Sequence, residues 1–327
     1  MATTLCFEHY PIYAISILIS SFLFTFLIIP SIIHVARNRH LYDDQSHSRK
    51  IHTPGISRLG GIAIFISFVI TLLLFGTKSS LFPFNYLLIS CILLFTIGIK
   101  DDLTGVGYLT KFTIQFLAAF IVVVPGNIRI QRLDGLLGID LLQNFSCIVL
   151  SILTIIFIVN SFNLIDGIDG LAATIGIVAN TAFSILFIYI QQYEIATISL
   201  SLVGALLGFI KFNLSPAKIF MGDTGALLIG LISAVMAIEF VRSFPLQQSL
   251  FPETRSALGI VTAILIIPIS DTIRIVVIRL SKGKSPFKAD RNHIHHLMLK
   301  LGFTPLQVTF ILALINIILI LVTFLFS

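Results

Sequence analysis

Long apolar segments alternate with short polar segments along the whole chain. The ten apolar segments are residues 11–33, 60–76, 85–99, 112–125, 146–159, 171–190, 195–210, 225–240, 257–280 and 306–326. Each is continuous, and a helix needs about 20 apolar residues to cross the hydrocarbon core of a bilayer. Because only helices and closed barrels satisfy their backbone groups in hydrocarbon, the pattern predicts an all-α, polytopic bundle of about ten transmembrane helices. The whole chain, 1–327, is expected to form one membrane domain, with an eleventh helix if residues 241–256 dip into the bilayer.

The composition supports a membrane protein. Hydrophobic residues make up 57% of the chain and charged residues only 11%, against about a quarter charged in an ordinary soluble domain. A soluble enzyme and a disordered chain are therefore excluded. The first apolar segment lacks a basic leader and a small-residue cleavage site, so it is expected to remain as a helix. The three cysteines show neither disulfide nor zinc-site spacing.

Charge is distributed unequally between the two sets of connecting segments. Sixteen of the 21 Lys and Arg residues fall in segments 34–59, 98–111, 160–170, 211–224 and 274–305. The positive-inside rule assigns this set to the cytoplasm, which places both termini outside. Seven of the eight histidines share that side, so we expect the chemistry at the cytoplasmic face of a bacterial inner membrane. An ion-coupled transporter is the non-enzymatic alternative, but it would carry its charges near the middle of the membrane.

Two adjacent acids, Asp101 and Asp102, end the third apolar segment. Neighbouring carboxylates at a low-dielectric boundary repel each other, which suits a metal–phosphate site or a general base. A solvated helix end with Lys100 and Lys111 as partners is the alternative.

In segment 160–170, oxygen-bearing side chains recur at every third position, at Asn160, Asn163, Asp166 and Asp169. This spacing places them along one side of a helix or turn, and Mg²⁺ prefers oxygen ligands. A capped turn would explain one Asp-Gly pair, but not four such residues in register. The segment is therefore predicted to be functional.

Segment 213–225 is polar, contains glycine and leads directly into an apolar helix. Asp223 and Thr224 stand where a helix cap is expected. Free backbone N–H groups at that helix start suit a phosphate, and Asp223 suits a metal ion. A plain cap remains an alternative.

A histidine cluster, His293, His295 and His296, follows Lys288 and Arg291. Cations interleaved with histidines suit an anion such as a diphosphate better than zinc; a solvated loop is the other alternative. Segment 49–61 is a further candidate, with function and topology equally supported. Together these patches predict a site for one polyanionic soluble molecule and one lipid, and their residue types suit phosphoryl transfer.

Four of these motifs, in this order, resemble the polyprenyl-phosphate N-acetylhexosamine-1-phosphate transferases, glycosyltransferase family 4. The motifs are Asp101–Asp102 and segments 160–170, 216–225 and 290–296. The separation of His293 from His295–His296 by one residue is similar to the WecA/TagO branch. That branch transfers GlcNAc-1-phosphate from UDP-GlcNAc to undecaprenyl phosphate and starts envelope glycans. The related MraY branch, which uses UDP-MurNAc-pentapeptide, usually has three consecutive histidines.

The resemblance implies roles for individual residues. Asp223 matches a Mg²⁺ ligand, Asp101 and Asp102 the acids near the lipid phosphate, and Phe220 the position against uracil. Together with the candidates from the patterns themselves, the predicted catalytic set is Asp101, Asp102, Asp166, Asp169, His295 and His296. The predicted substrate-binding set is Lys111, Asn160, Asn163, Lys218, Phe220, Arg291 and His293, with Asp223 as the metal ligand.

The expected reaction yields undecaprenyl-diphosphate-sugar and UMP. Mg²⁺ is the expected cofactor, with Mn²⁺ as a substitute, and the expected partners are a UDP-N-acetylhexosamine, undecaprenyl phosphate and membrane lipids. No nucleic acid is expected, and a homodimer stays open, as does the choice among UDP-sugar donors. A CDP-alcohol phosphatidyltransferase is disfavoured, since Asp169 and Gly170 are not followed by the arginine and spaced aspartates of that signature.

Overall fold

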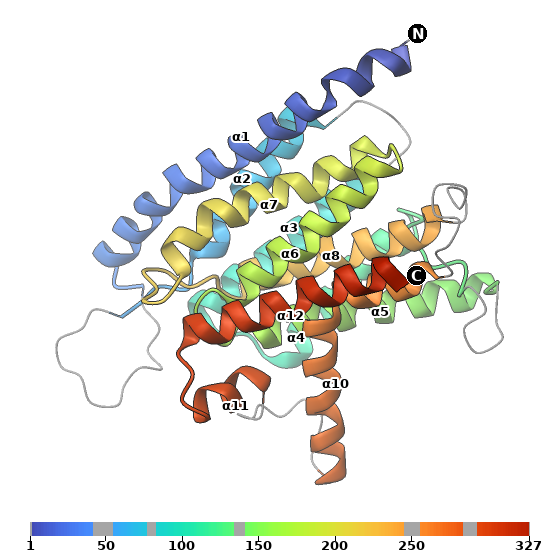
Figure 1. Ribbon diagram of the computed structural model, residues 1–327. Helices are drawn as coiled ribbons and strands as arrows, with labels where there is room; N and C mark the ends of the chain where they lie inside the picture. The colour runs from blue at the N-terminus through green and yellow to red at the C-terminus, as the bar shows by residue number, and fades with distance from the viewer. Residues whose placement is uncertain are drawn as a thin grey trace.

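The computed structural model describes residues 2–41, 55–76, 83–133, 141–244, 256–283 and 293–326. Its helices are α1 Ala2–Asn38, α2 Gly60–Phe75, α3 Phe84–Thr104, α4 Tyr108–Val123, α5 Asn144–Ile165, α6 Leu171–Tyr189, α7 Tyr193–Asn213, α8 Gly222–Ser243, α9 Ala257–Ile264, α10 Ile266–Ser281, α11 Ile294–Lys300 and α12 Pro305–Phe326. Within these residues the only β pairing is an isolated bridge between Arg132 and Leu141. The all-α prediction is confirmed (Figure 1). Arg291 lies outside the described residues. Residues 245–255, which make up most of the segment considered for an eleventh helix, also lie outside them.

Each of the ten predicted apolar segments forms a helix or a helix pair. In the described part of the chain, α1, α5, α6, α7, α8 and α12 are long and apolar enough to cross a membrane, whereas α2 and α4 are apolar but shorter. The ninth segment differs from the prediction of one span, because α9 and α10 meet at an angle of 80°. Pro268 lacks an N–H, and its ring would clash with the carbonyl of Ile264, where α9 ends. As a result, α10 runs across the bundle rather than along it (Figure 1).

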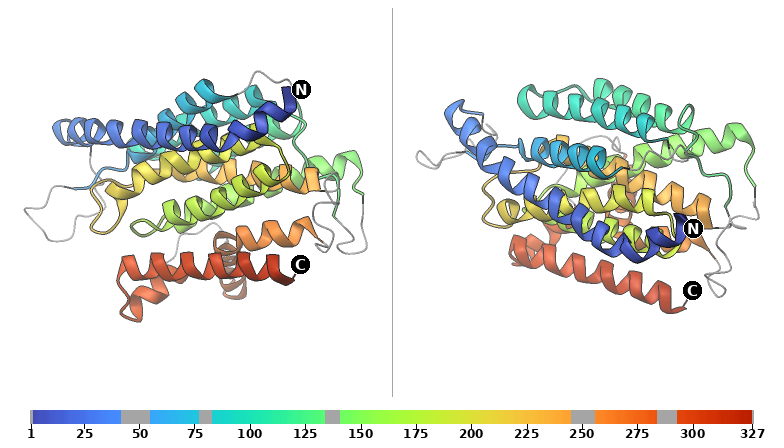
Figure 2. Two further views of the ribbon diagram at one scale, coloured as in Figure 1. Left: turned by 45° about the horizontal axis from the view of Figure 1, so that its top comes forward. Right: turned by 90° about the horizontal axis from the view of Figure 1, so that it is seen from above.

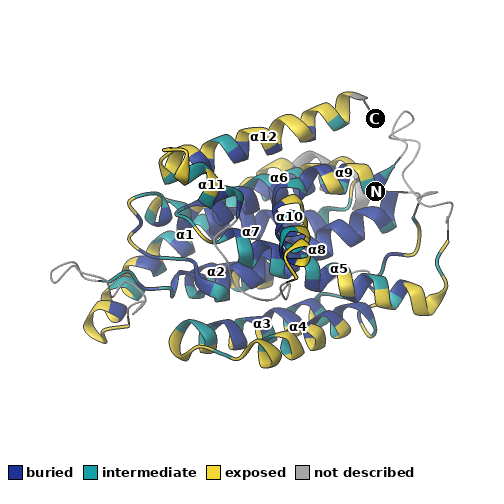
Figure 3. Cartoon of the chain, turned by 90° about the horizontal axis from the view of Figure 1, so that it is seen from below, coloured by how far each residue is buried: buried dark blue, intermediate teal, exposed yellow. Residues whose placement is uncertain are grey.

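Helix α8 forms the centre of the bundle. All residues in the most apolar stretch of α8 are buried. In the corresponding stretches of α1 and α12, only 22% and 33% of the residues are buried. Figure 3 shows the same contrast between the dark blue α8 and the largely exposed α12. An all-round apolar helix such as α8 is typical of a bundle core. Both chain termini lie at one end of the bundle (Figure 2), and α8 begins at the opposite end, called the site end below.

Glycines let α2 and α3 approach α8 closely at the site end. A Cβ atom on Gly61 would lie 2.3 Å from the backbone nitrogen of Gly225, and one on Gly98 would lie 2.6 Å from Cα of Thr224. Small residues commonly allow such approach between helices in membranes. The packing brings the last turn of α3, with Asp101 and Asp102, onto the first turn of α8.

Candidate active site

Three connecting segments of the site end enclose a polar cavity of about 360 Å³. It is lined by Arg58, Asp166, Gly167, Ile168, Asp169, Asn213, Phe220, Gly222 and Asp223. Backbone hydrogen bonds hold the segments together: Phe220 N donates to Ser57 O at 2.8 Å, and Gly60 N donates to Phe220 O at 3.0 Å. This pairing carries Arg58 to the cavity. Arg58 is not among the predicted site residues, although it belongs to the candidate segment 49–61.

Asp102 caps α8 from a different helix. Its Oδ1 accepts from the Asp223 N–H at 2.8 Å, and its Oδ2 accepts from the Thr224 N–H at 3.0 Å and from the Thr224 hydroxyl at 2.5 Å. These groups are the free donors of a helix start, where a negative charge is favourable. Gly222 has φ +69°, and a Cβ there would meet both carboxylate oxygens at 2.6 Å. Asp102 therefore fixes the position of Asp223.

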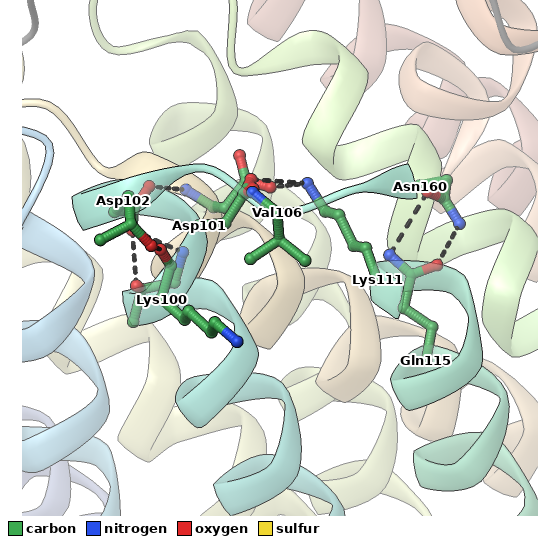
Figure 4. A network of polar contacts seen from close by, with 10 residues as sticks. Lys100, Asp101, Asp102, Val106, Lys111, Gln115 and Asn160 are labelled. Atoms are coloured by element: carbon green, nitrogen blue, oxygen red, sulfur yellow. Dashed lines mark hydrogen bonds and ion pairs between the residues drawn. The ribbon is translucent and has the colours of Figure 1, made fainter. Parts of the chain in front are cut away.

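Asp101 faces a lysine rather than α8. Its Oδ1 accepts from the Val106 N–H at 2.6 Å, and its Oδ2 lies 3.3 Å from Lys111 Nζ, as Figure 4 shows. Lys111 also forms an ion pair with Asp223. One ammonium group thus joins the first acid of the pair to the predicted metal ligand.

Asp166 and Asp169 follow α5 and differ in their partners. Asp169 Oδ2 accepts from the Ala217 N–H at 3.2 Å, and its backbone carbonyl accepts from the Thr309 hydroxyl at 3.1 Å. Burial raises the pKa of the Asp166 carboxyl well above its usual value; Asp102 and Asp169 raise it further, and Arg58 opposes the shift. A partly buried acid among like charges favours either a proton or a bound cation.

The histidine cluster closes the side of the cavity near Gly167. His295 is only 1% exposed, and a Cβ on Gly167 would lie 2.4 Å from its Nε2. Burial, together with the neighbouring His296 and His293, lowers the pKa of His295 to about 4, while Asp271 opposes the shift. His295 is therefore neutral at neutral pH. Neither of its ring nitrogens has a hydrogen-bond partner in the described protein.

Comparison with known proteins is consistent with this arrangement. Residues 84–241 match the model described as glycosyl transferase family 4. The chain is 31% identical over 277 residues to a decaprenyl-phosphate N-acetylglucosaminephosphotransferase of Mycolicibacterium smegmatis, covering 78% of this chain and 68% of the relative. It is 32% identical over 297 residues to an undecaprenyl-phosphate alpha-N-acetylglucosaminyl 1-phosphate transferase of Escherichia coli O157:H7, covering 89% and 77%. The chain belongs to glycosyl transferase family 4.

A probable undecaprenyl-phosphate N-acetylglucosaminyl 1-phosphate transferase of Bacillus subtilis is also 32% identical, over 80% of this chain and 70% of the relative. The predicted resemblance to polyprenyl-phosphate sugar-phosphate transferases is thereby confirmed at the level of the family.

In this family 4 member, only some of the predicted site residues line the cavity. Asp166, Asp169, Phe220 and Asp223 line the cavity, and His295 packs against its Gly167 wall. Asn160 instead pairs with Gln115 of α4, donating to its Oε1 at 2.8 Å (Figure 4). The remaining predicted residues, described but not lining the cavity, are Asp101, Asp102, Lys111, Asn163, Lys218, His293 and His296.

Within the described residues, no three His, Cys, Asp or Glu side chains form a ready cluster for a metal ion. Mg²⁺ at a phosphate site usually needs only one or two carboxylates, with substrate phosphates and water completing its shell. Asp223, with Asp166 lining the same cavity, meets that requirement. Lys111 already places a cation beside this carboxylate. The donor set thus fits Mg²⁺.

Mg²⁺ is expected to stabilise this protein more at about pH 7.5 than at about pH 5. Because the pKa of Asp166 is raised, the folded protein holds a proton that the unfolded chain has lost at pH values between the ordinary and the raised pKa. Without metal, the free energy of unfolding therefore falls as the pH rises through the pKa of Asp166 in the folded protein. A bound cation offsets the repulsion between the ionised Asp166 and its neighbours Asp102 and Asp169. Thermal unfolding with and without Mg²⁺ measures this, with Asp166→Asn as the control that should flatten the pH dependence. Equal Mg²⁺ shifts at both pH values would contradict it.

Proposed function

We propose that this protein transfers GlcNAc-1-phosphate from UDP-GlcNAc to undecaprenyl phosphate, releasing UMP, at the cytoplasmic face of a bacterial inner membrane. The observation that carries the proposal is the cavity at the site end, where carboxylates, Arg58 and the histidine cluster meet beside the capped start of α8. The names of the relatives support the acceptor and the sugar phosphate. The excess of Lys and Arg in the connecting segments of this end supports its cytoplasmic orientation.

An apolar groove supports a polyprenyl acceptor. It measures about 480 Å³ and lies between α5, α8, α9 and the start of α10, with Phe157, Leu265 and Ile269 among its lining residues. Phe157 is nine residues before Asp166 along the chain, which is about 13 Å on a helix. A lipid tail in this groove would leave its phosphate at the polar end of α5.

In the proposed reaction, an oxygen of the lipid phosphate attacks the β-phosphorus of the UDP-sugar. The bond between that phosphorus and the bridging oxygen breaks, and UMP carries the electron pair away. The second pKa of a phosphate monoester is near 6, so much of the nucleophile is already dianionic at neutral pH. Positioning and charge neutralisation then supply most of the catalysis.

The geometry supports different roles for the two paired acids, Asp101 and Asp102. Both oxygens of Asp102 are engaged by α8, so Asp102 orients Asp223. Among the described residues, Asp101 Oδ2 contacts the ammonium of Lys111 and no backbone N–H of α8, so Asp101 is the acid proposed to take the remaining proton of the lipid phosphate. Asp223 would hold Mg²⁺, which neutralises charge on the diphosphate when bound. Arg58 and Lys111 supply further positive charge to the phosphates.

The test is a transfer assay with sugar-labelled UDP-GlcNAc, undecaprenyl phosphate and the purified full-length protein. Label is expected to move into the organic phase together with an equal amount of UMP, and to depend on the lipid. UDP-GalNAc and UDP-MurNAc-pentapeptide are tested as competing donors. Absence of labelled lipid with every UDP-sugar, from protein that is folded, would contradict the proposal.

A further inference from the structure

A buried acid stands on the helix that leaves the bundle. Asp271 of α10 is 2% exposed, although the same helix presents Ile273, Val277 and Leu280 to its surroundings at 50–59% exposure. Figure 1 shows α10 crossing the direction of α12, with α11 close to the site end. A carboxylate buried on such an apolar helix is costly unless it is paired. Its position therefore calls for specific partners.

Those partners are the first residues of the histidine cluster. Asp271 Oδ2 lies 2.8 Å from Nδ1 of His293, and Oδ1 accepts from the Ile294 N–H at 2.8 Å. Because an ionised carboxylate only accepts hydrogen bonds, Nδ1 of His293 must carry the hydrogen. Asp271 thus determines both where α11 begins and which ring nitrogen of His293 stays available.

The orientation of His293 is passed on to the cavity. The rings of His293 and His295 are nearly parallel, at 8° with centroids 5.4 Å apart, and the centroids of His295 and His296 are 4.3 Å apart. His295 in turn packs against Gly167, which lines the cavity. Its two ring nitrogens are buried and have no partner in the described protein. The cluster therefore presents the unsatisfied imidazole of His295 beside the substrate cavity.

We propose that Asp271 is a positioning residue for the transfer reaction, acting through His293 to hold the histidine stack against the Gly167 wall of the cavity. This inference rests on the proposed function. Asp271 does not line the cavity, so its effect on the reaction passes through His293. At many catalytic sites, a carboxylate side chain orients an imidazole by a hydrogen bond of this kind.

The decisive variant is Asp271→Asn. The asparagine carbonyl still accepts from the Ile294 N–H, but its amide group donates towards Nδ1 of His293 and forces the hydrogen onto Nε2. We expect kcat/KM to fall about tenfold or more while the protein still folds. Since Asp271 acts through His293, the double variant D271N/H293A should be no slower than H293A alone. Additive losses would indicate separate effects and overturn the proposal.

Glu239→Gln is the matched control. Glu239 is also a fully buried acid, hydrogen-bonded to Arg242 at 2.6 Å, but it lies near the far end of α8. Its replacement is expected to leave transfer within about twofold of wild type. If D271N also stays within about twofold, the proposal is wrong.

A second measurement does not depend on activity. In protein labelled with ¹⁵N-histidine, the His293 ring signals are assigned by their loss in H293A. Nδ1 is expected to carry the hydrogen in wild type and to lose it in D271N. A hydrogen absent from Nδ1 in wild type overturns the proposal. If wild type transfers no sugar phosphate at all, the proposed function fails, while the ring signals still decide the orienting role of Asp271.

Discussion

Asp223→Asn is expected to abolish transfer of the sugar phosphate, lowering kcat by about three orders of magnitude or more. The substitution removes the negative charge that would hold Mg²⁺ beside the diphosphate. The fold should survive, because among the described residues the only ion pair of Asp223 is with Lys111, and the two side chains are 24% and 19% exposed. Partly exposed pairs of this kind contribute little to stability. Single-turnover transfer and thermal unfolding of the same preparation measure the two effects separately.

Glu194→Gln is the control for Asp223→Asn. Glu194 lies in the first turn of α7, at the end of the bundle opposite to the cavity, so its replacement should change neither Mg²⁺ dependence nor rate. Calorimetric titration of Mg²⁺ with UMP present should show weakened binding only for Asp223→Asn. Wild-type rates in Asp223→Asn would contradict the metal assignment.

Asp102→Asn is expected to reduce transfer by about 100-fold or more and also to lower the free energy of unfolding by about 2 kcal/mol. The carboxylate accepts three hydrogen bonds from Asp223 and Thr224. An asparagine offers one oxygen, and its amide hydrogens would point at N–H donors that then remain unsatisfied. Both the start of α8 and the Asp223 carboxylate should shift, so activity and stability fall together.

Thr224→Val separates the contribution of the Thr224 hydroxyl from that of the backbone N–H groups that Asp102 caps. It keeps the shape of the side chain and removes only the hydroxyl hydrogen bond to Asp102. We expect a smaller loss, of about 1 kcal/mol in stability and about tenfold in rate. Chemical denaturation and the transfer assay report both quantities. An Asp102→Asn protein as stable as wild type but inactive would assign Asp102 a direct chemical role instead of a capping role.

The helical bundle was largely predictable from local sequence, and the residues that line the cavity were predictable in part. The ten apolar segments all became helices, because the length and continuity of an apolar segment are decided within about 20 residues. Asp166, Asp169, Phe220 and Asp223 were predicted as site residues, and all four line the cavity. The bend of 80° between α9 and α10 was missed, although Pro268 carried a signal for it.

Other features depend on contacts between residues far apart in the sequence. Asp102 and Asp223 are separated by 121 positions, and nothing local distinguishes a carboxylate that caps a distant helix from one that faces a substrate. The same holds for Arg58, which reaches the cavity through backbone pairing of its segment with residues around Phe220. Likewise, Asn160 belonged to a convincing three-residue repeat but pairs with Gln115 of a neighbouring helix.

The sequence by itself therefore determined the membrane bundle, the end at which its chemistry gathers and the residue types of that chemistry. Hydropathy, charge asymmetry and motif spacing are all properties of short segments. Tertiary structure alone decided the division of labour, with Asp102 capping α8, Asp101 facing Lys111 and Asp271 orienting His293. The physical reason is that the role of a carboxylate is set by the donors it meets in three dimensions, and those donors come from other helices.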